Sequence, residues 1–587
     1  MQMYKKRLKY SYFYPLLISK IIPMKKISVL ICLIISLTIS ARSQSTRMVL
    51  IEEATNASCG PCASQNPAFD ILLNQNRDKL TAIKYHWYFP GNDPMQNQNP
   101  TENNARVSYY GINGVPTATI DGDIPDGPTF SYPGGPHGYT QQLIDDYAAV
   151  PSPFNLWLSH RISDDQDSIY VDMMIEATQA VSGTLIAHMV VVEKHIYFAS
   201  PPGSNGETTF LDVMKKMIPD QFGTTLPSSF EPGQYLILQG AWQLANIYDM
   251  DELGVVGFIQ NNANKDVLQA ANSSAEPLTP LYDNEVDVTG ISNISASNCL
   301  GTIEPKVIIR NNGAETLTDV DIVYNINSGA NEVFHWTGNL DFLESEEVTL
   351  PQLSFDILDQ NQFNASIEYP NGVPDEYVNN DSRIYPFDRA DITPLTVKLM
   401  IRLDENPGQT TWQIVNSAGE VQYSGGPYTQ ANTIVQETFQ MEDVECYIFR
   451  IFDAGGDGLL IPGFFALYYG SNSYILTGTE FGAIDTAYFE VNTQVGLGEK
   501  NSESPVTIFP NPARNAFAIS FFVTDPQKVE ISLYDLAGHL VMQEEPGIYS
   551  NGRQSVTIDA TALKAGVYYI KSKIGKEVSM HKITIIK

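Results

Sequence analysis

The chain begins with a pattern typical of an α/β unit and then changes to patterns typical of strands. The apolar run at residues 48–51 predicts a buried strand, and residues 63–73 predict a helix with an apolar face. From residue 153 onward most segments predict β-strands separated by glycine, proline and asparagine turns. The first such segments are 154–162, 168–177 and 183–196, and a hairpin is expected from 255–260 and 265–270. Residues 208–217 are expected to form a short helix or a connection.

Strict alternation marks the later strands. Apolar side chains occupy every second position in 320–326 (Val320, Ile322, Tyr324 and Ile326), and residues 395–403 alternate in the same way. The sequence therefore predicts a multidomain protein, α/β plus all-β, with one α/β domain followed by several β-sandwich modules of immunoglobulin-like or jelly-roll-like type. The expected parts are a targeting segment (1–43), the α/β domain (46–145), sandwiches (150–284, 285–387 and 390–492), a linker (493–504) and a last module (505–587).

The first 43 residues have the pattern of a secretory signal peptide. Lys25 and Lys26 precede an apolar run at 27–39, and small residues follow at 41–43. Met24 is a candidate start, which would make residues 1–23 an upstream extension. No later segment has the length of a transmembrane helix, so we expect no membrane span in the mature chain.

Charge excludes one class of partner. Residues 1–43 hold eight Lys or Arg and no Asp or Glu, so the rest of the chain has a net charge of −40. Nucleic acid is a poor partner for such a surface.

Four cysteines follow the targeting segment. Cys299 has no second cysteine within its module, which favours a free buried thiol, and Cys446 lacks a partner just after its own turn. Pairing of these two residues is left open. Cys59 and Cys62 form a C-G-P-C motif at the predicted strand-to-helix junction. Unpaired N–H groups and the helix dipole there favour a thiolate, which makes the sulfur nucleophilic. A zinc site would need two more ligands, and no second C-x-x-C or H-x-x-x-H follows.

The segment around this motif resembles the active-site region of thioredoxin-fold proteins. Besides C-G-P-C, the matches are Pro67 in the helix, Glu53 six residues before Cys59, and Y-G-I-N-G-V-P-T at 110–117. The resemblance implies that Glu53 helps proton transfer at the second cysteine, that Pro116 follows a cis bond, and that backbone groups of Val115 meet an extended substrate. Ser58 departs from the family, which has tryptophan at this position.

Two further resemblances concern location. The order V-V-V-E-K-H-I at 190–196, G-E-T-T-F-L-D-V-M-K-K-M-I-P at 206–219 and V-G-F-I-Q-N-N-A-N-K-D-V-L-Q-A-A-N at 256–272 resembles the Omp28-related outer-membrane proteins of Bacteroidetes. The motifs P-N-P at 510–512 and Y-D-L-A-G at 534–538, with the basic-apolar end of the chain, resemble the C-terminal sorting domain (type A) of the Bacteroidetes type IX secretion system. These resemblances imply export through the periplasm to the cell surface or medium, with the type IX machinery as a partner.

A second candidate site lies in the 390–492 module. Asp453 and Asp457 belong to a D-x-x-G-D-G turn and could offer carboxylate oxygens to Ca²⁺. The alternative is a tight turn whose glycines supply positive φ, and this alternative is favoured because no complete calcium loop is present.

The sequence is compatible with two functions. The first is an exported thiol–disulfide oxidoreductase that acts on protein disulfides or dithiols with Cys59, Cys62, Glu53 and Pro116, and that needs no organic cofactor. The second is a surface binding or adhesion protein without catalysis, in which C-G-P-C is a structural disulfide.

Overall fold

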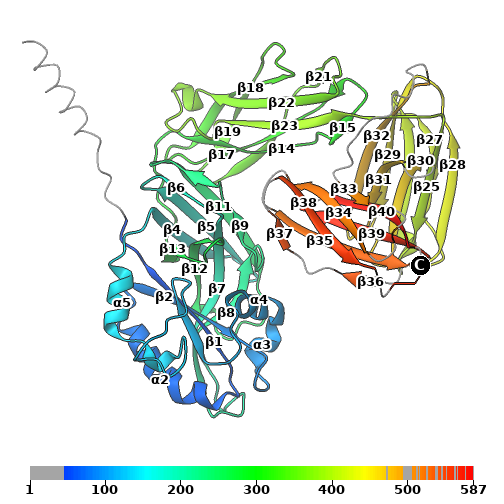
Figure 1. The fold of residues 1–587 in the computed structure, drawn as a ribbon. Helices are drawn as coiled ribbons and strands as arrows, with labels where there is room; N and C mark the ends of the chain where they lie inside the picture. The colour runs from blue at the N-terminus through cyan, green and yellow to red at the C-terminus, as the bar shows by residue number, and fades with distance from the viewer. Residues whose placement is uncertain are drawn as a thin grey trace, which may run out of the picture. The chain divides into compact units, whose positions relative to one another are not determined.

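The structure is a computed structural model that describes residues 45–470, 473–493 and parts of 506–585. The parts described after 505 are 506–509, 513, 516–523, 527–535, 540–543, 547–549, 552–560, 563–564, 566–575 and 577–585. The expected signal peptide and nearly all of the expected linker lie outside the described residues. The chain divides into two compact units (Figure 1). The first ends at Thr279 and the second begins at Pro280, and each is described by itself.

One large sheet organises the first unit, with strand order β13-β12-β7-β8-β2-β1-β3 and the short β9 beside β7. Its strands are β1 (Val49–Thr55), β2 (Leu80–His86), β3 (Thr117–Ile120), β7 (Leu185–Tyr197), β8 (Thr209–Ile218), β9 (Thr224–Thr225), β12 (Leu253–Asn261) and β13 (Val267–Asn272). β1 and β2 are parallel and β3 is antiparallel to β1. β8 joins β2 where Val213 pairs with Lys84, so strands from residues 46–145 and 150–284 share one sheet.

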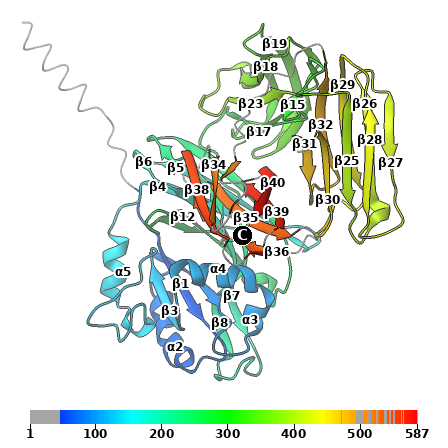
Figure 2. The ribbon, with the colours of Figure 1, turned by 45° about the vertical axis from the view of Figure 1, so that its right-hand side comes forward.

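Helices cover both faces of β1 and β2. They are α2 (Gly60–Asn74), α3 (Pro94–Gln98), α4 (Pro100–Tyr110) and α5 (Gln141–Ala148). Because side chains of a strand alternate between faces, Ile51 packs with Phe69 of α2 and Ile144 of α5, whereas Leu50 packs with Val107 of α4. α2 and α5 therefore lie on one face of the sheet and α4 lies on the other (Figure 2).

A second, three-stranded sheet packs against β7 and β12. It contains β4 (Phe154–Ile162), β5 (Ser168–Ala177) and β11 (Tyr235–Gln243), and the short β6 (Val181–Ser182) and β10 (Ser229–Phe230) pair nearby. Met189 and Val191 of β7 face this sheet, whereas Val190 and Val192 face the core under α4. Burial on both faces explains why β7 reads as a continuous apolar run in the sequence.

The expectation of a short helix or connection at residues 208–217 is wrong, because this segment forms β8. Its pairing with β7 is irregular, and Asp212 has a positive φ of 53°. Such irregularities break the two-residue alternation that identifies a strand in a sequence. The segment is extended because it hydrogen-bonds to β7 on one side and β2 on the other.

The second unit begins with a β-sandwich. Its sheets are β14-β17-β20 and β15-β23-β22-β18-β19, with β16 and β21 as a separate pair. The strands are β14 (Val286–Ser292), β15 (Ser297–Asn298), β16 (Thr302–Ile303), β17 (Lys306–Asn311), β18 (Leu317–Ile326), β19 (Glu332–Leu340), β20 (Ser345–Thr349), β21 (Leu353–Ser354), β22 (Gln360–Glu368) and β23 (Ser382–Arg389). The predicted alternation in β18 is confirmed, because Val320, Ile322, Tyr324 and Ile326 all enter the core.

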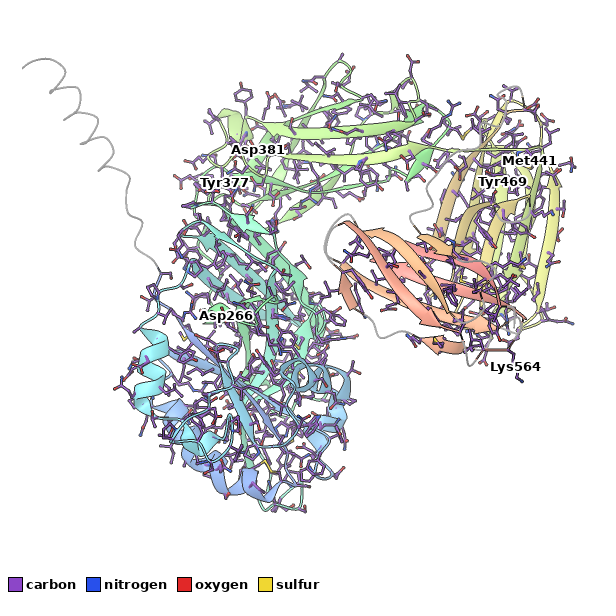
Figure 3. The ribbon with its side chains drawn as sticks, in the orientation of Figure 1. Asp266, Tyr377, Asp381, Met441, Tyr469 and Lys564 are labelled. Carbon is purple, nitrogen blue, oxygen red and sulfur yellow. A yellow bond between two sulfur atoms is a disulfide. The ribbon has the colours of Figure 1, made fainter. Side chains whose placement is uncertain are left out.

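A second sandwich follows, with sheets β24-β32-β29-β26-β27 and β28-β25-β30-β31. Its strands are β24 (Asp391–Thr393), β25 (Thr396–Arg402), β26 (Thr410–Asn416), β27 (Val421–Gly425), β28 (Ile434–Gln440), β29 (Glu445–Asp453), β30 (Phe464–Tyr469), β31 (Ser473–Gly478) and β32 (Ile484–Val491). Its core includes Val397, Leu399 and Ile401 of β25, and Met441, which is labelled in Figure 3.

The described residues after 505 form two further sheets around a core of their own, β33-β34-β38 and β36-β35-β39-β40, with β37 beside β35. Their strands are β33 (Val506–Phe509), β34 (Ala516–Val523), β35 (Gln527–Asp535), β36 (Leu540–Gln543), β37 (Gly547–Tyr549), β38 (Gly552–Asp559), β39 (Gly566–Ile574) and β40 (Glu577–Ile585). The described chain is thus mostly β and is built from several sandwich modules, as expected.

A disulfide joins Cys299, just after β15, to Cys446 in β29. The expectation of a free thiol at Cys299 is therefore wrong. The two residues are 147 positions apart and their Cα atoms are 5.6 Å apart. The sequence could not pair them, because each cysteine belongs to a different sandwich and only the folded chain brings them together.

We expect the double substitution Cys299→Ser and Cys446→Ser to destabilise the two sandwiches of residues 285–493. The disulfide closes a long loop in the unfolded chain, which in the chain-entropy account stabilises the folded state by about 5 kcal/mol. Calorimetry of the secreted protein should show a lower melting temperature for this part of the chain. Cys59→Ser with Cys62→Ser is the matched control and should leave that transition in place; equal melting of all three proteins would contradict the prediction.

Candidate functional site

The Cys59–Cys62 disulfide lies at the beginning of α2. Cys59 is the N-cap residue, and the backbone N–H of Cys62 donates to Cys59 Sγ at 3.1 Å. Pro61 occupies the first turn, where its missing N–H leaves no bond unmade, and Pro67 lies inside the helix. Once the pair is reduced, the helix N-terminus favours a thiolate at Cys59.

β1 places Glu53 on the face of the sheet that α2 covers, and its side chain is fully buried. Lys84 is its register partner on β2, with Nζ 3.0 Å from Glu53 Oε2. The same Nζ donates to Asp70 of α2, so Lys84 links the strand carboxyl to the helix. Glu53 Oε1 has no hydrogen-bond partner among the described residues.

Burial raises the pKa of Glu53 to about 7, although the positive charge of Lys84 opposes this shift. Burial alone would lower the pKa of Lys84, but the charges of Glu53 and Asp70 raise it above its ordinary value. Near neutral pH Glu53 can therefore take up or release a proton while Lys84 stays charged.

A third segment reaches the disulfide from the loop before β3. The Val115–Pro116 bond is cis, as the sequence resemblance implies, and Cys59 Sγ lies 3.4 Å from Val115 O. Tyr132 donates a hydrogen bond to Pro116 O at 2.9 Å, which holds this loop in place. The structure thus brings Pro116 beside Cys59 and Cys62, with Glu53 beneath the helix that they begin.

Two residues that hold this site together, Lys84 and Asp93, were not among the candidates that the sequence pattern indicates. Lys84 was detectable in principle, as a lone lysine in an otherwise uncharged stretch of a buried strand. Asp93 was not detectable, because no sequence pattern links it to Ala57, 36 positions before it. Its Oδ2 accepts from the N–H of Ala57 at 2.7 Å and lies 2.6 Å from His86 Nδ1. Although burial raises the pKa of Asp93, His86 and the backbone donors lower it below its usual value.

The second candidate site, at Asp453 and Asp457, lies in the other unit at the end of β29. Asp453 is buried, and its Oδ2 accepts from the N–H groups of Asp457 (3.1 Å) and Gly458 (3.3 Å). Gly456 and Gly458 have φ of 79° and 74°, as a tight turn requires. Across the described residues, no three His, Cys, Asp or Glu side chains gather as a metal site. Calcium binding at this turn stays a prediction.

Among the residues that the structure describes, no helix is both long and apolar enough to cross a membrane.

Comparison with known proteins identifies the end of the chain. Residues 507–587 match the family described as "Secretion system C-terminal sorting domain". This is the tail that the type IX secretion machinery handles. The protein is therefore exported to the cell surface or secreted, as predicted from the sequence. No curated protein matches the chain.

Solved structures show weak similarity. HBP35 of Porphyromonas gingivalis is 13% identical, with a TM-score of 0.34, and the match covers 59% of this chain and 99% of that one. A domain of the outer membrane lipoprotein Omp28 from the same organism is 12% identical, with a TM-score of 0.16, and the match covers 22% and 94%. The CARDB domain of the PF1109 protein from Pyrococcus furiosus, solved with di-metal ions, is 20% identical, with a TM-score of 0.16, and the match covers 20% of this chain and 95% of that one.

The raised pKa of Glu53 predicts a specific pH dependence. Because the folded state holds this proton more tightly than the unfolded state, the resulting stabilisation is complete below about pH 4.5 and is lost as the pH rises through about 7. The free energy of unfolding of the wild type should therefore fall by roughly 3 kcal/mol over this pH range, and this fall should be absent in Glu53→Gln. Denaturant unfolding of both proteins between pH 4 and 9 measures it. Glu231→Gln, which changes an exposed carboxylate of the same unit, is the control and should follow the wild type.

Proposed function

We propose that residues 45–279 of this secreted protein form a thioredoxin-like domain that exchanges thiols and disulfides with other proteins. The observation that carries the proposal is the buried carboxyl of Glu53, with a pKa of about 7, beneath the helix that begins with Cys59 and Cys62. Burying an acid with an unpaired oxygen destabilises a protein. A disulfide that only cross-links the chain needs no such group, whereas a redox pair needs a proton acceptor.

The arrangement of elements supports the same proposal. A parallel β1-α2-β2 unit is followed by the antiparallel β3, with helices on both faces of the sheet. The cis peptide before Pro116 lies beside the disulfide, where the resemblance to thioredoxin-fold proteins places it.

In the proposed reaction, the Cys59 thiolate attacks one sulfur of a substrate disulfide, and the other substrate sulfur leaves as a thiolate. Glu53 then accepts the proton of the Cys62 thiol, and Cys62 attacks Cys59 Sγ. The bond between Cys59 and the substrate breaks, the second substrate thiolate leaves, and the Cys59–Cys62 disulfide forms. Two electrons pass to the substrate; the reverse sequence oxidises a substrate dithiol.

The alternative is a binding or adhesion protein in which the Cys59–Cys62 disulfide is structural. One observation favours it: Cys59 is 1% exposed and Cys62 is not exposed at all. In that case ligand binding would reside in the sandwiches of residues 285–493, and calcium at Asp453 and Asp457 would belong to that role.

Trapping the covalent intermediate distinguishes the two functions. With a disulfide-bonded test protein, Cys62→Ser should accumulate an adduct through Cys59 that dithiothreitol releases, because the residue that breaks the mixed disulfide is gone. Cys59→Ser should form none. In Glu53→Gln, reoxidation of the reduced pair at pH 7 should slow by about a hundredfold. Non-reducing gels and rapid mixing measure these outcomes. If Cys62→Ser forms no adduct, the structural alternative holds.

A further inference from the structure

The loop between β7 and β8, residues 198–208, lies against the segment that leads into the disulfide. The N–H of Phe198 donates to Thr208 O at 2.8 Å, which closes the base of this loop. Above that base, Ser204 N donates to Ser58 Oγ at 3.1 Å, and Asn205 N donates to Ala57 O at 3.3 Å. We call residues 198–208 the strap.

The side chain of Asn205 continues this contact. Its amide donates to Asn56 O at 3.3 Å and to Cys59 O at 3.1 Å. The strap therefore engages the carbonyl of the cysteine expected to attack a substrate, and the carbonyls of residues before it.

Gly203 shows how closely the two backbones approach. A Cβ at this position would lie 2.1 Å from Ala57 O and 2.4 Å from Ala57 C, both of which are backbone atoms. Only glycine allows this distance, so the strap is fitted to the segment before the disulfide.

Glu207 anchors the strap to the other side of the site. Its carboxylate accepts from Asn66 Nδ2 at 3.1 Å and from the side chain of Asn205, and its N–H donates to Asn205 Oδ1 at 2.9 Å. Asn66 lies on α2 one turn after Cys62, and both are buried. The strap thus spans from residues 56–59 to the helix.

Thiol–disulfide exchange requires a thiolate to reach a disulfide sulfur. With Cys59 1% exposed and Cys62 fully buried, the disulfide is closed to such an attack as the structure stands. An extended polypeptide can offer N–H donors to the carbonyls of residues 56–59 and so replace the bonds of the strap. A small thiol cannot replace several of them at once.

We propose that the strap determines substrate specificity: it excludes small thiols from the Cys59–Cys62 disulfide and gives way to polypeptide dithiols that take its place. This inference rests on the proposed exchange function. It assigns Asn205 and Gly203 a role in the choice of substrate and no role in the thiol–disulfide exchange itself.

Two variants open the strap in different ways. Asn205→Ala removes the bonds to Asn56 O and Cys59 O, and Gly203→Ala forces the strap away from Ala57. The control is Asn264→Ala in the turn between β12 and β13, where Asn264 bonds Asp266, which is labelled in Figure 3. Calorimetry checks that each full-length protein is folded.

The first probe is dithiothreitol, which reduces the disulfide to two thiols and is itself oxidised to a cyclic disulfide. We expect both variants to be reduced about tenfold faster than the wild type and the control, a change equivalent to losing one or two hydrogen bonds. The second probe is a reduced, unfolded polypeptide at a saturating concentration, at which it has already displaced the strap. Its oxidation by the disulfide should therefore change by less than twofold among the four proteins.

Equal rates with dithiothreitol in all four folded proteins would overturn the role of the strap, even if the polypeptide is oxidised. Faster reduction of the variants by dithiothreitol, with no oxidation of the polypeptide by any of the proteins, would instead contradict the proposed exchange function.

Discussion

The first unit depends on two adjacent glutamates of β1 that point to opposite faces of a buried sheet. Glu52 is held by Arg106 of α4, with Nη2 2.7 Å from Oε1, and Glu53 by Lys84 of β2. Removing one partner of a buried ion pair leaves an uncompensated charge, which typically costs about 3–5 kcal/mol. Arg106 also donates hydrogen bonds to Gln260 of β12. The ion pairs of the two β1 glutamates therefore position α4 and β2 against β1, and Arg106 connects α4 to β12.

The two glutamates differ in how many hydrogen-bond partners their carboxylates have. On the α4 face both oxygens of Glu52 are hydrogen-bonded, by Arg106, Tyr85 and Tyr110, so that side is saturated. On the α2 face Glu53 pairs with Lys84, which it shares with Asp70, and one of its oxygens has no hydrogen-bond partner among the described residues. Two identical side chains in consecutive positions thus have different surroundings, and burial raises the pKa of Glu53 to about 7.

Sequence patterns predicted the features that depend on neighbouring residues and did not predict the contacts between segments that are far apart in the chain. The alternation in 320–326 depends only on one buried face, and the position of Cys59 at a helix N-terminus depends only on the adjacent strand and helix, so both were predictable. β8 was not, because its extended form comes from pairing with β7 and β2. The Cys299–Cys446 disulfide and the contacts of Asn205 with Cys59 were hidden for the same reason: their partners lie on segments far apart in the chain.

The Cys299–Cys446 disulfide has a mechanical consequence for a protein exposed outside the cell. A pulling force applied to the chain before Cys299 and after Cys446 passes through the two sulfurs. It bypasses the chain between the two cysteines, which are 147 positions apart. At about 3.4 Å per extended residue, roughly 500 Å of chain is withheld from stretching. Under shear, the two sandwiches can therefore lose their fold without the chain between Cys299 and Cys446 adding its contour length to the protein, and reduction of this one bond would release that length.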